Sequence, residues 1–162
     1  TVTHPIPPVF DSASRILILG SFPSVKSREG HFFYHHPQNR FWKTLAGVLD
    51  VPAPDTIDEK KAFLLSHRIA LWDVIASCDI AGSSDASIRN AVPNDLTPIL
   101  ETASIRQIFT NGGTAHRLYR KYIYPLTGRE DAVLPSTSPA NAARSLDALI
   151  NAWQPVCEAL EE

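Results

Sequence analysis

Residues 15–24 read Arg-Ile-Leu-Ile-Leu-Gly-Ser-Phe-Pro-Ser. A short run of leucine and β-branched residues that stops at glycine and proline predicts a buried strand followed by a tight turn. Similar runs occur at residues 69–75, 105–110 and 132–134. Segments with helical spacing or helix-start signals separate them, at residues 39–49, 56–66, 95–103 and 114–124. Strands that alternate with helices predict an α/β three-layer sandwich, with a central, mostly parallel sheet of four or five strands flanked by helices.

Residues near the helix ends refine this prediction. Asn94 is expected to cap the helix at residues 95–103, since asparagine is a favoured N-cap. Ser138 is expected to cap the last helix, with Pro139 at its first position. Pro155 should then kink or break that helix.

The composition is that of an ordinary globular protein, with 162 residues of which 44% are hydrophobic and 20% are charged. This length predicts a single domain spanning residues 1–162. No apolar run approaches the roughly 20 residues that a membrane span needs, and no basic-then-apolar leader opens the chain. The two cysteines, Cys78 and Cys157, lie far apart, which excludes an all-cysteine metal site and suggests a reducing compartment.

The net charge of −2 does not by itself indicate a nucleic-acid-binding protein. A compact enzyme that holds a few phosphates needs only a local basic face. Solvated surface is the default for each basic side chain, but six could form such a face: Lys26, Arg28, Arg117, Arg120, Lys121 and Arg144.

The functional site of a parallel α/β sheet lies at the carboxyl ends of its strands. The loops expected there are residues 21–38, 76–93, 111–113 and 135–138. Residues 77–93 read as a long polar loop, and a loop of this length in a small domain is usually functional. Residues 32–42 read Phe-Phe-Tyr-His-His-Pro-Gln-Asn-Arg-Phe-Trp, and flat rings beside an uncharged amide suit the binding of an extruded nucleobase.

Two motifs together carry a resemblance to a known family. Residues 20–24 form a tight turn at a strand end, and residues 36–42 read His-Pro-Gln-Asn-Arg-Phe-Trp. This pair resembles the uracil-DNA glycosylase superfamily, whose mismatch-specific branch carries a similar run. Further residues resemble the sixth family of that superfamily, the hypoxanthine (deoxyinosine) DNA glycosylases: residues 71–75, 87–90, 94–95 and 111–112, and Cys78. The resemblance extends from about Pro8 to Trp153.

The resemblance implies that Asn39 is the catalytic amide. Other branches place an Asn or Asp in the first turn, where this chain has Ser21 or Phe22, and the first family has a histidine where this chain has Leu134. A neutral Asn39 can orient a water through its carbonyl and donate from its amide to the departing base. The alternative interpretation is that Asn39 only caps the helix that follows, and both roles are compatible.

The base-binding residues implied are Phe22, Phe33, Tyr34 and Asp73. Tyr34 lies where the mismatch branch stacks a ring on the flipped base, with Phe33 as a second candidate, and core packing is the alternative for both. The Asp73 carboxylate could accept the N1–H of hypoxanthine, which adenine lacks. The alternative is that Asp73 caps the following turn.

His36 is a candidate to protonate the departing purine. His31, His35 and His36 have no acidic or cysteine residue at ligand spacing beside them, so we expect no metal, and no organic cofactor is implied.

Contacts with the DNA backbone are expected from the loops around the site. Pro135, Ser136, Thr137 and Ser138 match the rigid second motif of the superfamily. The alternative interpretation of residues 135–138 is a turn that only caps the following helix. Asn111 and Gly112 form a candidate phosphate nest, although a plain strand-to-helix turn is the simpler interpretation. Ser24 is the remaining candidate for DNA binding.

The sequence therefore predicts a monofunctional DNA glycosylase that removes hypoxanthine from deoxyinosine by base flipping. The expected partner is double-stranded or single-stranded DNA with a deaminated base, and the expected protein is a monomer in the prokaryotic cytoplasm, at the nucleoid. One alternative is a mismatch-specific uracil or thymine glycosylase. The other is a noncatalytic nucleotide- or nucleic-acid-binding α/β domain.

Overall fold

The computed structural model describes residues 1–161. Its central sheet has four parallel strands in the order β3-β2-β6-β7. These strands are β2 (Ile16–Gly20), β3 (Ile69–Asp73), β6 (Gln107–Asn111) and β7 (Asp131–Leu134). In the register of the sheet, Ile18 pairs with Leu71 on one side and with Phe109 on the other. The predicted α/β fold with a parallel sheet is confirmed.

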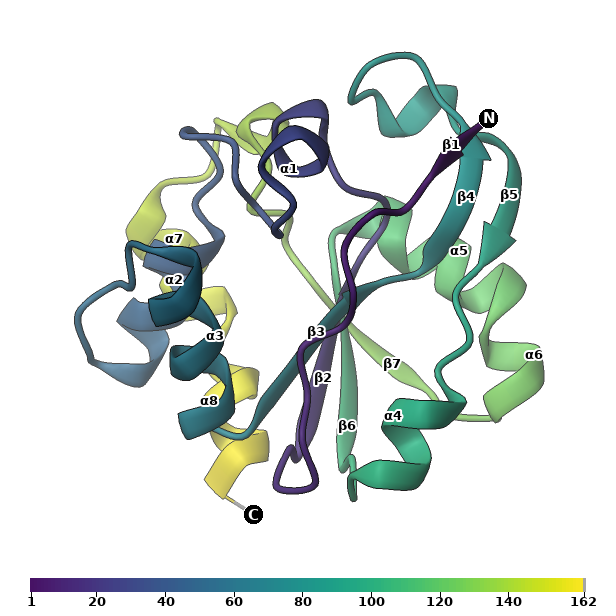
Figure 1. Cartoon of the computed structure of the whole chain (residues 1–162). Coiled ribbons are helices and arrows are strands. Elements are labelled where there is room, and N and C mark those ends of the chain that lie inside the picture. The colour runs from purple at the N-terminus through teal and green to yellow at the C-terminus, as the bar shows by residue number, and fades with distance from the viewer. Residues whose placement is uncertain (162) are drawn as a thin grey trace.

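Helices cover both faces of this sheet (Figure 1). One face carries α2 (Phe41–Leu49), α3 (Ile57–Ser66), α7 (Leu146–Ala152) and α8 (Gln154–Glu161). The other carries α4 (Thr97–Thr102), α5 (Gly113–Tyr122) and α6 (Tyr124–Thr127), while α1 (Val25–Gly30) lies beyond the end of β2.

The alternation of side chains along β2 builds a separate core on each face. Ile16 and Ile18 pack into the core that includes Phe41 and Trp153. Leu17 and Leu19 pack into the other core. Because both faces are buried, the strand is apolar throughout, and this is why its sequence is such a strong strand signal.

A second sheet is the main departure from the prediction. It has three antiparallel strands in the order β1-β4-β5, namely β1 (Val2–Thr3), β4 (Ile75–Asp79) and β5 (Arg89–Pro93). The single strand predicted at residues 69–75 is therefore wrong, because the chain leaves the central sheet at Val74. The continuous loop predicted at residues 77–93 is also wrong, since it holds most of β4, a short 3-10 helix (Asp85–Ser87) and β5.

Two predicted caps are also wrong. The Asn94 amide donates to the carbonyls of Asp73 and Ile75, where the two sheets diverge, so it does not cap α4. Ser138 accepts from the N–H of Ala140 in a short 3-10 helix (Pro139–Asn141), and Ser145 caps α7 instead. The break expected near Pro155 is confirmed, because α7 ends at Ala152 and α8 begins at Gln154.

None of the helices formed by residues 1–161 combines the length and the apolar character of a membrane span.

Candidate active site

A pocket of about 350 Å³ opens at the carboxyl ends of the parallel strands. Gly20, Asp73 and Asn111 end β2, β3 and β6 there, and the loop after β7 closes the fourth side. The volume lies within the range of small-molecule sites, about 300–1,000 Å³. Most of the predicted site residues line this pocket: Phe22, Ser24, Phe33, Tyr34, His36, Asn39, Asp73, Asn111, Ser136, Thr137 and Ser138.

Asn39 has its carbonyl oxygen fully engaged and its amide group free. Its Oδ1 accepts from the N–H of Phe41 at 2.9 Å and from the hydroxyl of Thr137 at 2.8 Å. The backbone N–H of Phe41 can only donate, which identifies the oxygen of this amide. Within residues 1–161, Nδ2 of Asn39 donates to no protein group. Asn39 thus accepts from the N–H of the first residue of α2, which is the contact expected of the capping role, and the carbonyl predicted to orient a water is already occupied.

Thr137 links Asn39 to Asn111. The side chain of Thr137 is buried, and its hydroxyl accepts from Nδ2 of Asn111 at 3.0 Å. In return, the N–H of Thr137 donates to Oδ1 of Asn111 at 3.1 Å. This hydroxyl therefore positions two asparagines that line the pocket, and the DNA contact predicted for Thr137 stays a prediction.

The aromatic rings form one wall of the pocket, and most of their surface is buried. Phe33 is 1% exposed and Phe22 is 7% exposed. The ring of Tyr34 stacks on Phe41 with 4.1 Å between centroids and 15° between planes, so Phe41 covers one of its faces. Tyr34 also has a positive φ of 53°, which is unusual for a bulky residue and is typical of functional sites.

The hydroxyl of Tyr34 is buried, makes no hydrogen bond within residues 1–161, and points toward the end of β2. Burial, together with the charge of Asp73, raises the pKa of this phenol far above its ordinary value. A Cβ atom at Gly20 would collide with the Asp73 carboxylate and this hydroxyl. Gly20 is therefore required for both groups to reach the pocket.

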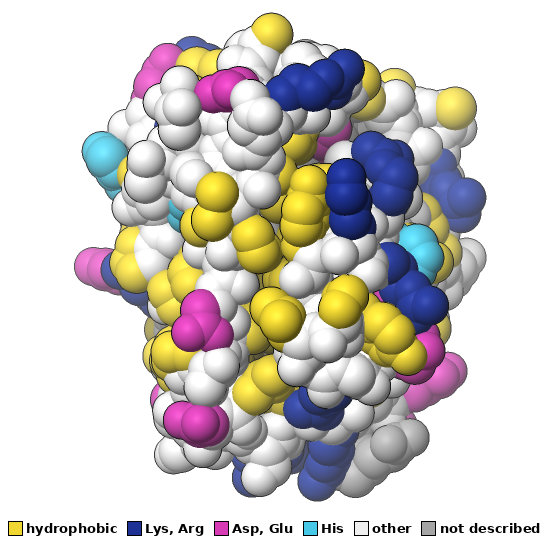
Figure 2. All heavy atoms as spheres, turned by 90° about the vertical axis from the view of Figure 1, so that its right-hand side faces the viewer, with side chains coloured by type: hydrophobic (Ala, Val, Ile, Leu, Met, Phe, Trp, Pro, Cys, Tyr) yellow, Lys and Arg dark blue, Asp and Glu magenta, His cyan; other side chains and the backbone are white. Residues whose placement is uncertain are grey.

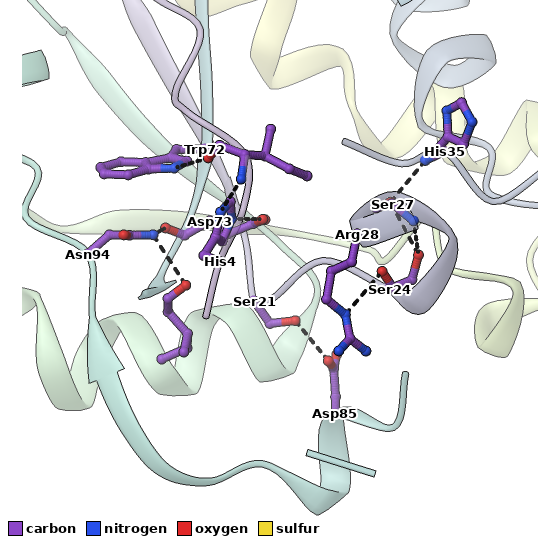
Figure 3. Close-up of polar contacts among 12 residues, drawn as sticks. His4, Ser21, Ser24, Ser27, Arg28, His35, Trp72, Asp73, Asp85 and Asn94 are labelled. Atoms are coloured by element: carbon purple, nitrogen blue, oxygen red, sulfur yellow. Dashed lines mark hydrogen bonds and ion pairs between the residues drawn. The ribbon is translucent and has the colours of Figure 1, made fainter. Parts of the chain in front are cut away.

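The Asp73 carboxylate is held by a histidine that the sequence did not indicate. Nε2 of His4 lies 2.7 Å from Oδ2 of Asp73, and the two side chains are 3% and 4% exposed (Figure 3). Nδ1 of His4 accepts from the N–H of Ile6 at 3.1 Å, so the proton is on Nε2 and the imidazole is neutral. A lone histidine in a proline-rich segment, far from Asp73 in sequence, carries no signal of this pairing.

Asp85 is the second carboxylate of the pocket, and it was also missed. The hydroxyl of Ser21 donates to its Oδ1 at 2.9 Å (Figure 3). Burial is the main cause that raises the pKa of Asp85, the charge of Asp73 adds to it, and the Ser21 bond and Arg117 oppose it. The length of the segment at residues 77–93 was the only hint that it reaches the site.

The remaining predicted residues lie at the rim or just behind it. Nδ1 of His36 accepts from the N–H of Gln38 at 3.1 Å, which places the proton of a neutral ring on Nε2. Gly112 and Pro135 do not line the pocket. The N–H of Gly112 donates to the carbonyl of Leu134, and the carbonyl of Pro135 accepts from the indole of Trp153, so Gly112 and Pro135 stabilise the loops around the pocket.

In the described residues, no three His, Cys, Asp or Glu side chains cluster as metal ligands would.

Comparison with known proteins identifies the family. The family model described as the uracil DNA glycosylase superfamily matches residues 7–157. The chain belongs to this superfamily. A protein from Methanosarcina acetivorans named hypoxanthine DNA glycosylase is 37% identical over 137 residues, which cover 83% of this chain and 85% of the relative. One of the same name from Methanosarcina barkeri is 31% identical, covering 91% of this chain and 92% of the relative.

A solved structure agrees with this membership. The solution NMR structure of a Methanosarcina acetivorans protein, titled as a candidate uracil DNA glycosylase, superposes with a TM-score of 0.82. It is 33% identical, and the match covers 97% of each chain. The enzyme class is thus DNA glycosylase, and the pocket at the strand ends is its candidate active site.

Proposed function

We propose that this superfamily member removes hypoxanthine from deoxyinosine in DNA and leaves an abasic site. The observation that carries the proposal is the free Nδ2 of Asn39, held in the pocket that Asp73 also lines. The amide of Asn39 donates hydrogen bonds and the carboxylate of Asp73 accepts them. A hypoxanthine ring has both acceptor and donor edges, so it needs both kinds of partner. The names of the two curated relatives support the same base.

Asp73 is the proposed reader of the base. His4 occupies one carboxylate oxygen, and the other lies beside Gly20 at the pocket wall. A buried carboxylate that accepts the N1–H of hypoxanthine would be left unpaired by adenine, which lacks this hydrogen. Loss of such a bond can reject an analogue by about 10⁴–10⁵-fold.

Asn39 acts in this proposal as a donor. When the N-glycosidic bond breaks, the base leaves with its bonding electrons, and a fixed N–H donor stabilises the negative charge that develops. Thr137 and the first turn of α2 hold the amide in place before the reaction. His36 is the proposed source of a proton for the purine, while Tyr34, Phe22 and Phe33 provide the wall against which the base lies.

The polar residues at the rim are the proposed contacts with the DNA backbone. Ser24, Ser136, Ser138 and Asn111 line the pocket. Gly112 and Pro135 stabilise the adjoining loops, and Thr137, which also lines the pocket, holds Asn111. We further propose that the protein acts as a monomer, on double- or single-stranded DNA at the nucleoid.

The test uses end-labelled duplexes that carry inosine, uracil or a G·T mismatch, incubated with the protein and then cleaved with alkali. We expect strand breaks at inosine. Asn39→Asp keeps the oxygen that caps α2 and accepts from Thr137 but removes the amide donor, so it should fold normally and react at least about 100-fold more slowly. Asn39→Ala should lose both activity and some stability.

Two other outcomes would contradict the proposal. Uracil and thymine also carry a ring N–H that Asp73 could accept, so breaks mainly at uracil or G·T would indicate a mismatch-specific glycosylase. Binding to these duplexes without breaks at any base would indicate a noncatalytic module.

A further inference from the structure

Hydrolysis of a glycosidic bond needs an acceptor that holds the attacking water. A water molecule can be oriented for attack only by a group that accepts one of its protons. The amide nitrogen of Asn39 can only donate, and its oxygen already accepts two hydrogen bonds. The amide that stabilises the departing base therefore leaves the water without a partner.

The pocket contains two carboxylates that can accept a proton from water, and their surroundings differ. The side chain of Asp73 is 4% exposed and is bonded to His4, which suits a fixed contact with the base. Asp85 lines the pocket with one oxygen bonded to Ser21, and its Oδ2 makes no hydrogen bond within residues 1–161. Asp85 is thus the carboxylate with an oxygen available to a water.

Several contacts hold Asp85 at this place. Ser21 directly follows β2, so its bond joins Asp85 to the end of the central strand. The guanidinium of Arg28 donates to the carbonyl of Gly82 at 2.5 Å, and the N–H of Val25 donates to the hydroxyl of Ser83 at 2.9 Å. These bonds join the segment between β4 and β5 to α1. The close-up shows the bond from Ser21 to Asp85 (Figure 3).

We propose that Asp85 is the catalytic residue that orients and deprotonates the hydrolytic water, an inference that rests on the proposed glycosylase function. The water oxygen forms a bond to C1′ of the sugar as the bond between C1′ and N9 breaks. The electron pair of that bond leaves with the base, which takes up one proton. One water proton passes to the Asp85 carboxylate and from there to solvent, and the products are an abasic sugar and free hypoxanthine.

The electrostatics of the pocket fit this role. Burial and the Asp73 charge raise the pKa of Asp85, which makes its carboxylate a stronger base. The titratable and charged groups that interact electrostatically with Asp85 are Asp73 on β3, Tyr34, Cys78 on β4, and Arg117 on α5, whose charge acts in the opposite direction. The negative charge of Asp85 would also stabilise the positive sugar of the transition state.

The test separates chemistry from binding. Asp85→Asn keeps the shape of the side chain, and we expect single-turnover excision of hypoxanthine to slow by about 100-fold or more. Binding to a duplex with 2′-fluorinated deoxyinosine, which resists hydrolysis, should be unchanged or tighter because a negative charge near the phosphates is removed. Asp50→Asn removes the same charge at an exposed position where asparagine tolerates the positive φ of 55°, and it should react normally.

Chemical rescue gives a second readout. In Asp85→Ala, added formate can supply the missing carboxylate, and we expect the rate to rise with formate but not with chloride at equal ionic strength. A merely structural role would show weakened binding and no rescue. Wild-type rates in Asp85→Asn would overturn the role of Asp85 and leave the proposed function intact, whereas wild-type protein that excises no base would overturn the proposed function itself.

Discussion

His4 and Asp73 form a hydrogen-bonded pair that water scarcely reaches. Their side chains are 3% and 4% exposed, and the ring of His4 packs against Phe22, Phe33 and Trp72. Removing one partner of such a pair leaves the other buried without its bond. Asp73, which is proposed to read the base, is therefore held in place by His4, a residue far from it in the sequence.

We predict that His4→Phe destabilises the protein by about 3–5 kcal/mol, because the new ring fills the space but leaves the carboxylate without its donor. Urea unfolding of His4→Phe, Asp73→Ala and the double variant measures the coupling. The double variant should cost less than the sum of the single variants, by about 1–3 kcal/mol. Additive losses would show that the two side chains act independently.

At the scale of elements, α3 has a first turn that is capped by its own residues. The hydroxyl of Thr56 accepts from the N–H of Glu59, and the Glu59 carboxylate accepts from the N–H of Thr56. These bonds from Thr56 lower the pKa of Glu59. This capping box satisfies two backbone N–H groups that the helix leaves unpaired, far from the pocket.

We predict that Thr56→Ala lowers the free energy of unfolding by about 1 kcal/mol without changing excision.

The pKa of Glu59 is lower in the folded chain. The contribution of Glu59 to stability is therefore complete above the unfolded pKa of about 4.3 and is lost as the pH falls through the folded value. The stability difference between wild type and Glu59→Gln should therefore shrink between neutral pH and about pH 3. A difference that grows on acidification would contradict the capping role of Glu59.

The elements that the sequence predicted are those whose signals are local. The apolar run of β2 is buried on both faces, and the turn at Gly20 follows from its own residues, so both could be read directly. The pocket-lining positions of Asn39, Tyr34 and Asp73 were likewise predicted, because strand ends in a parallel sheet converge at one edge.

The elements that were missed depend on contacts between distant segments. β5 is a mostly exposed edge strand that contains proline and pairs with β4 through register shifts, so it lacks the alternation that marks a strand. The turn at Val74 lies in an apolar stretch that only Asp73 interrupts, without a glycine or proline to signal that the chain changes sheets. Asp85 reaches the pocket, and His4 reaches Asp73 at the pocket wall, only through this second sheet, and no local pattern could have placed them there.

At the scale of the whole molecule, a net charge of −2 has to be reconciled with binding to DNA. Figure 2 shows the face toward which α5 and α6 lie, where Lys and Arg side chains gather along one side. Arg117, Arg120 and Lys121 are exposed on α5. Arg120 pairs with Glu130, whereas Arg117 makes no ion pair within residues 1–161. α5 begins at Gly113, two residues after Asn111, which lines the pocket, and the charge of Arg117 lowers the pKa of Asp85.

We predict that Arg117 contacts a phosphate of bound DNA. Arg117→Gln should weaken binding to inosine-containing and undamaged duplexes by a similar factor, because a phosphate contact is independent of sequence. The slope of log affinity against log salt should become shallower by about 1. The measurement uses the 2′-fluorinated duplex, so that any effect of Arg117 on the chemistry of Asp85 does not enter.

Lys61→Gln is the matched control, since it removes one exposed positive charge from α3 on the opposite face of the sheet. Both variants lower the net charge by the same amount, so a long-range effect of total charge would change the two salt slopes equally. A phosphate contact changes the slope of Arg117→Gln alone, because only the charge beside the bound strand releases a counterion. Equal slopes in the two variants would contradict a phosphate contact by Arg117.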